Sequence, residues 1–121
     1  MSVRVAKSAG FCFGVSRAVE LVEQAAKAGK KVVTLGPIIH NHHVVDKFRA
    51  LGVEVIGTPE QACPGQTVII RSHGVSRAVY EELQRRGVEI IDATCPFVKR
   101  IHGIVSRAEE EGQLPVIIGT P

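Results

Sequence analysis

The sequence contains few aromatic residues and no long apolar run. Its 121 residues include four Phe, one Tyr and no Trp, and the formal net charge is only +3. With few rings to stack on bases and little positive charge, nucleic acid is a poor candidate partner, whereas a small anionic ligand is suitable. No apolar run approaches the roughly 18 residues of a membrane span, and the first residues do not have the pattern of a signal peptide. We therefore expect neither nucleic acid nor a membrane as partner.

Cysteine is also scarce. The three cysteines, Cys12, Cys63 and Cys95, are odd in number and widely spaced, so they do not form a disulfide framework. We expect a cytoplasmic protein whose cysteines are reduced or bound to metal. The sequence contains no Walker loop, no Gly-x-Gly-x-x-Gly, no Gly-x-Ser-x-Gly and no Cys-x-x-Cys motif.

Strand and helix patterns alternate along the chain. Strands are expected at residues 3–7, 31–35, 53–56, 67–71, 88–91 and 115–118. Helices are expected from an N-cap at Ser16 to Gly29, at 42–51, at 76–86, and from Pro96 onward. This order predicts an α/β fold in which a mostly parallel sheet is flanked by helices.

The segment around Cys95 connects an apolar strand pattern to a helix. Pro96 follows at the first helical position, where the missing N–H costs nothing. Apolar residues at 97, 98, 101, 104, 105 and 108 mark one face of that helix. Cys95 therefore lies at a strand's carboxyl end and a helix's amino end, where the helix dipole and free N–H groups favour a metal-binding thiolate. The alternative is a small buried apolar cysteine.

Three further residues occupy the same kind of position. Cys12 and His73 each precede one copy of the repeat Gly-Val-Ser-Arg-Ala-Val, at 14–19 and 74–79, and His40 ends the loop after another strand. Ligands of open α/β sheets bind outside the carboxyl ends of strands, so these residues and Cys95 can converge. Histidines beside helix amino termini suit phosphate oxygens, although a turn histidine with a structural role is the alternative. Positive charge near this edge comes from Arg71, Lys99 and Arg100, for which solvation is the default expectation.

A zinc site is another interpretation of the histidines. His40, His42 and His43 lack the i, i+4 spacing of a helical zinc pair, and no carboxylate accompanies them in the pattern. His42 and His43 are better explained as an exposed helix start. We expect His102 to be solvated, because it lies off the apolar stripe of its helix, and Cys63 to be incidental.

Four local motifs occur together and in order. They are Ala-Gly-Phe-Cys-Phe-Gly-Val at 9–15, Ile-His-Asn at 39–41, Ser-His-Gly-Val-Ser at 72–76 and Asp-Ala-Thr-Cys-Pro at 92–96. As a set they closely resemble the LytB/IspH family of 4-hydroxy-3-methylbut-2-enyl diphosphate reductases, iron–sulfur enzymes of the non-mevalonate isoprenoid pathway. The resemblance covers the whole chain, and its specificity comes from the agreement of all four motifs.

The resemblance implies a cofactor, a substrate and a reaction. Cys12 and Cys95 match two of the three cysteines that hold a [4Fe-4S] cluster, and His40 and His73 match two histidines that hold the substrate diphosphate. The implied reaction removes an allylic hydroxyl reductively, with two electrons and two protons, to give isopentenyl and dimethylallyl diphosphates. The implied partners are the allylic diphosphate substrate and an electron donor such as ferredoxin or flavodoxin.

The resemblance also implies a longer protein. Family members are trefoil-like, with three α/β units around the cluster, so we expect residues 1–92 to be the first unit and 93–121 the truncated start of a second. The matched third histidine, proton-relay glutamate, third cysteine and Ser/Asn diphosphate loop fall beyond Pro121, and Cys63 does not match the missing ligand. No catalytic residue is therefore expected within this chain, which we expect to be inactive alone.

Two other classes of protein remain open. One is a non-catalytic α/β module that binds a small phosphate ester through His40 and His73 without iron. The other is a redox or metal protein that uses Cys12 and Cys95 differently, for example with zinc. Colour separates them, because an iron–sulfur protein purified without oxygen is brown and absorbs near ~400 nm.

Overall fold

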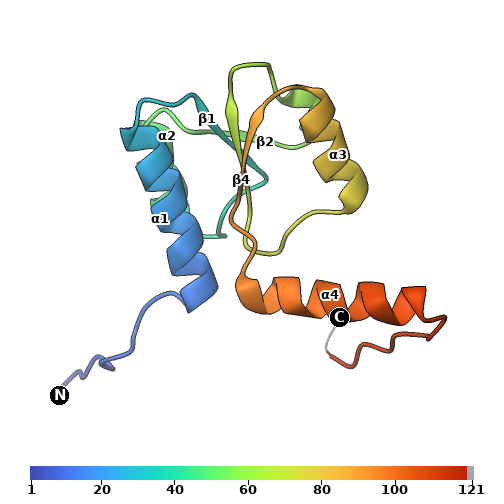
Figure 1. Cartoon of the computed structure of the whole chain (residues 1–121). Coiled ribbons are helices and arrows are strands. Elements are labelled where there is room, and N and C mark those ends of the chain that lie inside the picture. Colours follow the sequence, from blue (N-terminus) through green and yellow to red (C-terminus); the bar gives the residue numbers. More distant parts are fainter. Residues whose placement is uncertain (120–121) are drawn as a thin grey trace.

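The computed structural model describes residues 1–119 and contains a four-stranded parallel sheet with helices on both faces (Figure 1). The strands are β1 (Val32–Leu35), β2 (Glu54–Ile56), β3 (Thr67–Ile70) and β4 (Glu89–Asp92), in the spatial order β2-β1-β3-β4. The helices are α1 (Phe13–Lys27), α2 (His42–Ala50), α3 (Arg77–Arg85) and α4 (Pro96–Glu110), with a 3-10 turn, η1 (Pro59–Gln61). The predicted α/β class with a mostly parallel sheet is confirmed.

The two central strands, β1 and β3, are buried along their whole length. Successive side chains of a strand point to opposite faces, so each strand contributes to two hydrophobic clusters. The cluster under α1 and α2 contains Ala18, Val22, Ala25, Val32, Ile38, Phe48, Val53, Ile69 and Ala93. The cluster under α3 contains Val33, Leu35, Ile56, Ala62, Val68, Ile70 and Leu83. Burial on both faces explains why these strands read as continuous aliphatic runs rather than as alternating patterns.

The starts of α2, α3 and α4 follow from local chemistry. Asn41 caps α2 by accepting a hydrogen bond from the Val44 amide at 3.3 Å. Ser76 caps α3 in the same way, accepting from the Val79 amide at 3.4 Å. Pro96 is the first residue of α4, as the sequence predicts. Each helix therefore begins at the carboxyl end of the strand before it.

The first helix begins earlier than predicted. The expected N-cap at Ser16 is wrong, because the Ser16 amide donates to the Cys12 carbonyl at 2.9 Å and so lies in the first turn of α1. Cys12 is the N-cap residue. In the second copy of the repeat, at 74–79, Gly74 has a positive φ of 78° and Ser76 does cap its helix. Six identical residues thus adopt two different backbone conformations.

Two of the six predicted strands do not form. Residues 3–7 and 115–118 have no strand partner within the part of the chain described. Their apolar side chains are exposed, including Val3, Val5, Val116, Ile117 and Ile118. An apolar segment becomes a strand only where a neighbouring strand satisfies its N–H and C=O groups, and a local pattern does not supply that neighbour.

Helix α4 continues from the end of β4 and lies across one edge of the sheet (Figure 1). Its predicted apolar stripe is largely exposed, with Phe97, Ile101 and Ile104 each at least half accessible to solvent. With 15 residues each, α1 and α4 are the longest helices described, and neither has the length needed to cross a membrane. The division into units at residues 92 and 93 stays a prediction.

Candidate functional site

The carboxyl edge of the sheet carries all four residues that the sequence singles out. His40 lies between β1 and α2, His73 between β3 and α3, and Cys95 between β4 and α4. Cys12 reaches the same edge by a different route, because α1 starts there and runs back toward the beginning of β1 (Figure 1). Cys12, His40 and His73 are exposed, and Cys95 is half-buried.

The two cysteine segments contact each other. A Cβ atom built on Gly14 would lie 2.8 Å from Cys95 Sγ, so the Cys95 thiol packs directly on the first turn of α1. Beside it, the rings of Phe13 and Phe97 meet edge to face, with centroids 6.3 Å apart. The residue after Cys12 and the start of α4 are therefore neighbours, although more than 80 residues separate them in sequence.

Backbone hydrogen bonds continue past the ends of the strands and hold the Cys95 segment in place. The Ala93 amide donates to the Ile70 carbonyl at 3.0 Å, and the Cys95 amide donates to the Ser72 carbonyl at 2.9 Å. Ser72 is the residue before His73. These backbone hydrogen bonds fix the position of Cys95 relative to His73, as an extension of the pairing between β3 and β4.

Asp92 stabilises the turn before Cys95. Its carboxylate accepts from the Thr94 amide at 2.9 Å and from the Thr94 hydroxyl, and it pairs with Lys99 Nζ at 2.6 Å. Burial raises the pKa of Asp92, but the bonds from Lys99 and Thr94 outweigh that effect and hold the pKa below its ordinary value. The Thr94 carbonyl in turn accepts from Arg17 Nη1 at 3.4 Å, which connects this turn to α1.

We expect the Asp92 interactions to make the stability sensitive to acid. Because the folded-state pKa is depressed, this contribution is present above the ordinary carboxyl pKa and is lost as the pH falls below about 4. The variant Asp92→Asn should therefore lose less stability than the wild type between about pH 6 and about pH 3, as measured by urea unfolding. Asp46→Asn, which alters an exposed surface pair with Arg49, is the control and should retain the wild-type dependence. Equal pH dependence of Asp92→Asn and the wild type would contradict this role.

A cleft of about 1120 Å³ opens at the same edge. It runs across the ends of β1, β2 and β3 and is bounded by α3 and α4. Its polar lining consists of Arg71, His73, Ser76, Arg77, His102, Ser106 and Glu109. Within residues 1–119, Cys12, His40 and Cys95 share the edge but do not line this cleft.

His102 and Arg71 line the cleft, although the sequence assigned neither of them a ligand role. His102 is exposed, as predicted, but its ring lies against Gly74, where a Cβ atom would be 3.0 Å from Cε1. The signal that could have found Arg71 is its position, directly after a buried central strand and two residues before His73.

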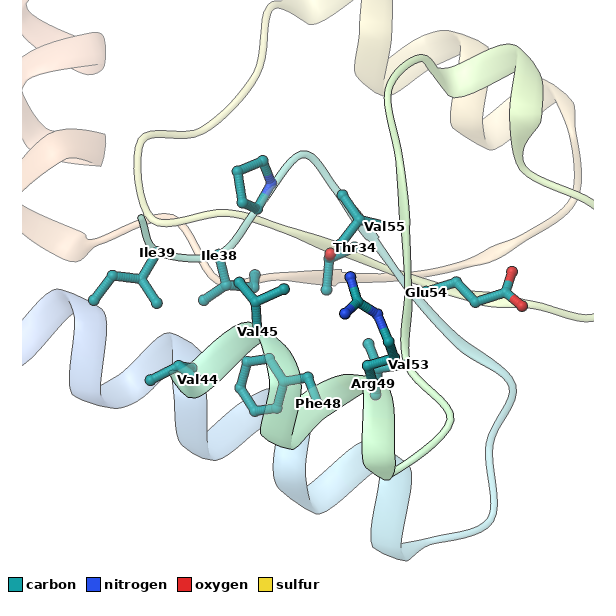
Figure 2. Close-up of a pocket in the computed structure, with 11 residues that line it drawn as sticks. Thr34, Ile38, Ile39, Val44, Val45, Phe48, Arg49, Val53, Glu54 and Val55 are labelled. Atoms are coloured by element: carbon teal, nitrogen blue, oxygen red, sulfur yellow. The ribbon is translucent and has the colours of Figure 1, made fainter. Parts of the chain in front are cut away.

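A smaller hollow of about 360 Å³ lies between α2 and the edge strand β2 (Figure 2). Its wall is mostly apolar, with Ile38, Val45 and Phe48 at its centre, and its charged members are Arg49 and Glu54. An apolar group suits this hollow better than an anion does.

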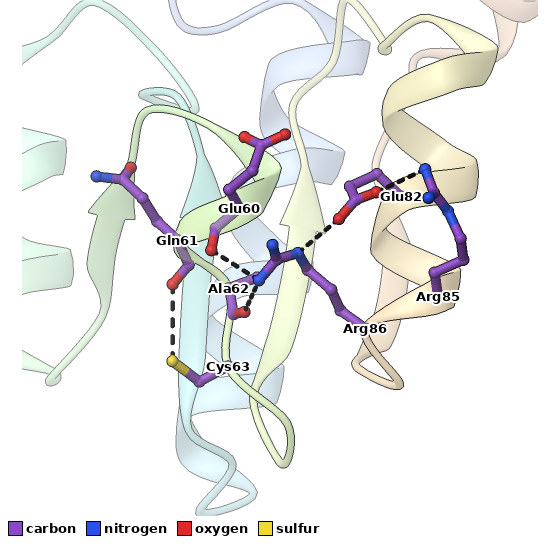
Figure 3. A network of polar contacts seen from close by, with 7 residues as sticks. All are labelled: Glu60, Gln61, Ala62, Cys63, Glu82, Arg85 and Arg86. Atoms are coloured by element: carbon purple, nitrogen blue, oxygen red, sulfur yellow. Dashed lines mark hydrogen bonds and ion pairs between the residues drawn. The ribbon is translucent and has the colours of Figure 1, made fainter.

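The cysteines at the edge fit part of an iron–sulfur ligand set. Cys12 and Cys95 are free thiols, the soft donors that such clusters use. Within residues 1–119 no three Cys, His, Asp or Glu side chains are grouped closely enough to hold a metal ion. Cys63 precedes the beginning of β3, where its thiol donates to the Gln61 carbonyl at 3.8 Å (Figure 3). The described chain thus offers two thiols at the carboxyl edge, and their role as cluster ligands stays a prediction.

Comparison with known proteins gives consistent results. Residues 3–121 match the family described as LytB protein. The chain is 46% identical over 119 residues to a 4-hydroxy-3-methylbut-2-enyl diphosphate reductase of Geobacter sulfurreducens, covering 98% of this chain and 42% of the relative. It is also 46% identical over 120 residues to the enzyme of that name in Aquifex aeolicus, covering 98% of this chain and 41% of the relative.

Two solved structures are also similar. One is of (E)-4-hydroxy-3-methyl-but-2-enyl diphosphate reductase, described as the terminal enzyme of the non-mevalonate pathway. It superposes with a TM-score of 0.83 at 46% identity and covers 98% of this chain and 42% of that chain. The other is the E-1-hydroxy-2-methyl-but-2-enyl-4-diphosphate reductase of Plasmodium falciparum, with a TM-score of 0.81 at 33% identity, over 87% of this chain and 33% of that chain.

The chain spans about 42% of the length of the curated relatives it matches. Within that span, the profile match, the sequence identity and the superposition agree over nearly every residue. The family resemblance drawn from the four motifs is therefore confirmed, and this chain belongs to the LytB family.

Proposed function

We propose that this chain provides part of the active site of a 4-hydroxy-3-methylbut-2-enyl diphosphate reductase. The reaction is the reductive dehydroxylation of this allylic diphosphate to isopentenyl and dimethylallyl diphosphates. The observation that carries the proposal is the packing of the Cys95 thiol against the helix that Cys12 begins, at the sheet edge that also holds His40 and His73. The names of the relatives support the same reaction class.

In this proposal Cys12 and Cys95 would be two of the residues that hold a [4Fe-4S] cluster. When bound, the cluster supplies the electrons for reduction and an iron that polarises the allylic hydroxyl. The rings of Phe13 and Phe97 meet edge to face beside both cysteine segments, and each keeps more than half of its surface exposed. An electron donor such as ferredoxin or flavodoxin belongs to the same proposal.

His40 and His73 bind the diphosphate in this proposal. Both are exposed, so a ligand can reach them, and each lies just before a helix of nine residues. The amino ends of α2 and α3 add a field that favours phosphate oxygens, and the ring N–H groups donate hydrogen bonds to them. The turn held by Asp92 and Lys99 positions Cys95.

The test uses the product of the complete natural reading frame, purified without oxygen and reconstituted with iron and sulfide. We expect a brown protein that absorbs near ~400 nm and reduces the substrate with a chemical electron donor. Cys12→Ser and Cys95→Ser should lose the colour and the bound iron, whereas Cys63→Ser should retain both, because Cys63 lies before the other end of β3.

Wild-type iron content in Cys12→Ser or Cys95→Ser would contradict the ligand assignment. A colourless wild-type protein that binds inorganic diphosphate would instead support the non-catalytic phosphate-binding module.

A further inference from the structure

Arg71 is a partly buried positive charge without an acceptor. Its Nε atom is buried and has no hydrogen-bond partner in the described chain, and its guanidinium forms no ion pair with any residue in the range 1–119. The arginines at the two ends of α3 are paired: Arg77 Nε bonds Glu81 at 2.9 Å, and Arg86 Nε bonds Glu82 at 2.8 Å (Figure 3). Arg71 differs from these two arginines in having no counter-charge among the described residues.

An unpaired charge in this position is unfavourable by itself. Removing a charged group from water costs free energy that a partner or ligand has to offset. A lysine or histidine can reduce this cost by losing its proton, but a guanidinium stays charged at any pH that a folded protein experiences. At Arg71 the Nε atom is buried without a partner, while the residue as a whole is half-buried and lines the open cleft, so an anion entering the cleft would meet a permanent positive charge there.

The topology of the sheet points to the same place. In the order β2-β1-β3-β4, the connections leave β1 and β3 in opposite directions, so the switch point lies between these two strands. Ligands of open α/β sheets bind at the carboxyl side of such a point. Arg71 directly follows β3, and Gly36 directly follows β1. A Cβ atom built on Gly36 would lie 3.1 Å from Arg71 Nη1. The guanidinium therefore spans the switch point.

Because Gly36 has no side chain, the Arg71 guanidinium can lie against the backbone of the loop after β1. Gly36 has a φ of 74°, and both Gly36 and Arg71 line the large cleft together with His73. The loops that follow β1 and β3 also carry His40 and His73, the two histidines assigned to diphosphate. A ligand held at His73 within this cleft would lie in the same space as the guanidinium.

We propose that Arg71 is an additional anion-binding residue, which provides a permanent positive charge for a phosphate group of the ligand beside His73. The inference rests on the proposed function, since the ligand is taken to be the same diphosphate. The planar guanidinium can donate two parallel N–H bonds to two oxygens of one phosphate, which an ammonium group cannot do.

The first test measures binding of inorganic diphosphate to the whole chain by calorimetry. Arg71→Gln should weaken binding at least tenfold. Arg71→Lys should have an affinity between those of Arg71→Gln and the wild type, because lysine keeps the charge but cannot donate two parallel N–H bonds to one phosphate. Arg85→Gln is the matched control. It removes the same charge from the far end of α3, outside the cleft, where the Arg85 side chain is 75% exposed and paired with Glu82, so binding should stay within about twofold.

The second test separates ligand binding from a structural role. Without ligand, Arg71→Gln should be at least as stable as the wild type in urea, because the substitution removes an uncompensated charge. Inorganic diphosphate should then raise the Tm of the wild type but not that of Arg71→Gln. A destabilised Arg71→Gln that still binds diphosphate normally would overturn the inference and assign Arg71 to packing.

Comparison with His73→Ala distinguishes this inference from the proposed function. If His73→Ala loses diphosphate binding and Arg71→Gln retains it, the inference is wrong and the histidine assignment stands. If Arg71→Gln loses binding and His73→Ala retains it, the anion site at Arg71 is supported and the diphosphate role of His73 is contradicted. If the wild type does not bind inorganic diphosphate even at about 10 mM, the inference is overturned, whatever the result of the reductase assay.

Discussion

Replacing Gly14 by alanine is expected to lower the free energy of unfolding by about 1–3 kcal/mol and to disturb the cysteine pair. The new methyl group would lie 2.8 Å from Sγ and 2.9 Å from Cβ of Cys95, which is closer than such atoms normally approach. Cys95 cannot simply withdraw, because its amide is bonded to the Ser72 carbonyl. The first turn of α1, which carries Cys12, has to shift instead. Urea unfolding measures the loss of stability.

The control for this variant is Gly103→Ala. Gly103 lies inside α4, and a Cβ atom there would meet nothing within 4 Å. Alanine is a better helix former than glycine, so this substitution should raise stability by about 0.5–1 kcal/mol. The same chemical change in two helices of equal length should therefore have opposite signs. A stabilising effect at both positions would show that Cys95 does not pack on α1 as described.

Replacing Leu83 by alanine is expected to have the largest effect on stability. Leu83 has no exposed surface. It is the fully buried residue of α3 and packs in the hydrophobic cluster that also contains Val33 and Ile70. Truncation leaves a cavity in a closely packed region, for which the cost is about 2–5 kcal/mol. Urea unfolding at neutral pH measures the change. Because α3 holds the loop with His73 in position, weaker diphosphate binding should accompany it.

Leu51→Ala removes the same atoms from a different environment. Leu51 lies at the end of α2 and is 42% exposed, so less apolar surface returns to water and no closed cavity forms. The loss of stability at Leu51 should be less than half of that at Leu83. Equal losses would contradict the anchoring role of Leu83.

Much of the fold could be predicted because short sequence patterns determine where most strands and helices form. Val33 and Ile69 lie in short aliphatic runs bounded by glycine, proline or polar residues, which is typical of strands buried on both faces. Ser76 and Pro96 mark helix starts that the structure contains. Once strands and helices alternate, parallel pairing follows, and every strand-to-helix loop is directed to one edge.

The errors have a common physical origin. Residues 3–7 and 115–118 have strand-like patterns, but a strand also requires a partner, which is a tertiary property. Ser16 has the chemistry of a cap, yet the helix passes through it. Arg71 was expected to add positive charge near this edge with solvation as the default, and only the structure reveals a buried Nε without a partner. Each error concerns what surrounds a residue, which its own sequence neighbourhood does not specify.

The roles of Cys12, His40, His73 and Cys95 stay predictions. Topology determines which edge they occupy, but binding of a cluster or diphosphate also depends on the remaining donors and on their geometry with the ligand bound. The variants proposed above address those properties directly.

The two copies of the repeated hexapeptide show what determines a helix start in this protein. Gly14 is helical and Gly74 has a left-handed backbone, although the six residues from each glycine onward are identical. Exchanging the two hexapeptides would leave the chain unchanged, so the difference is encoded outside them, in the residues that flank each copy and in the contacts that each copy makes. The hexapeptide is conformationally ambivalent, and its transfer to another protein would not bring a defined helix boundary with it. The residues directly before each copy differ, and they include Cys12 at one site and His73 at the other.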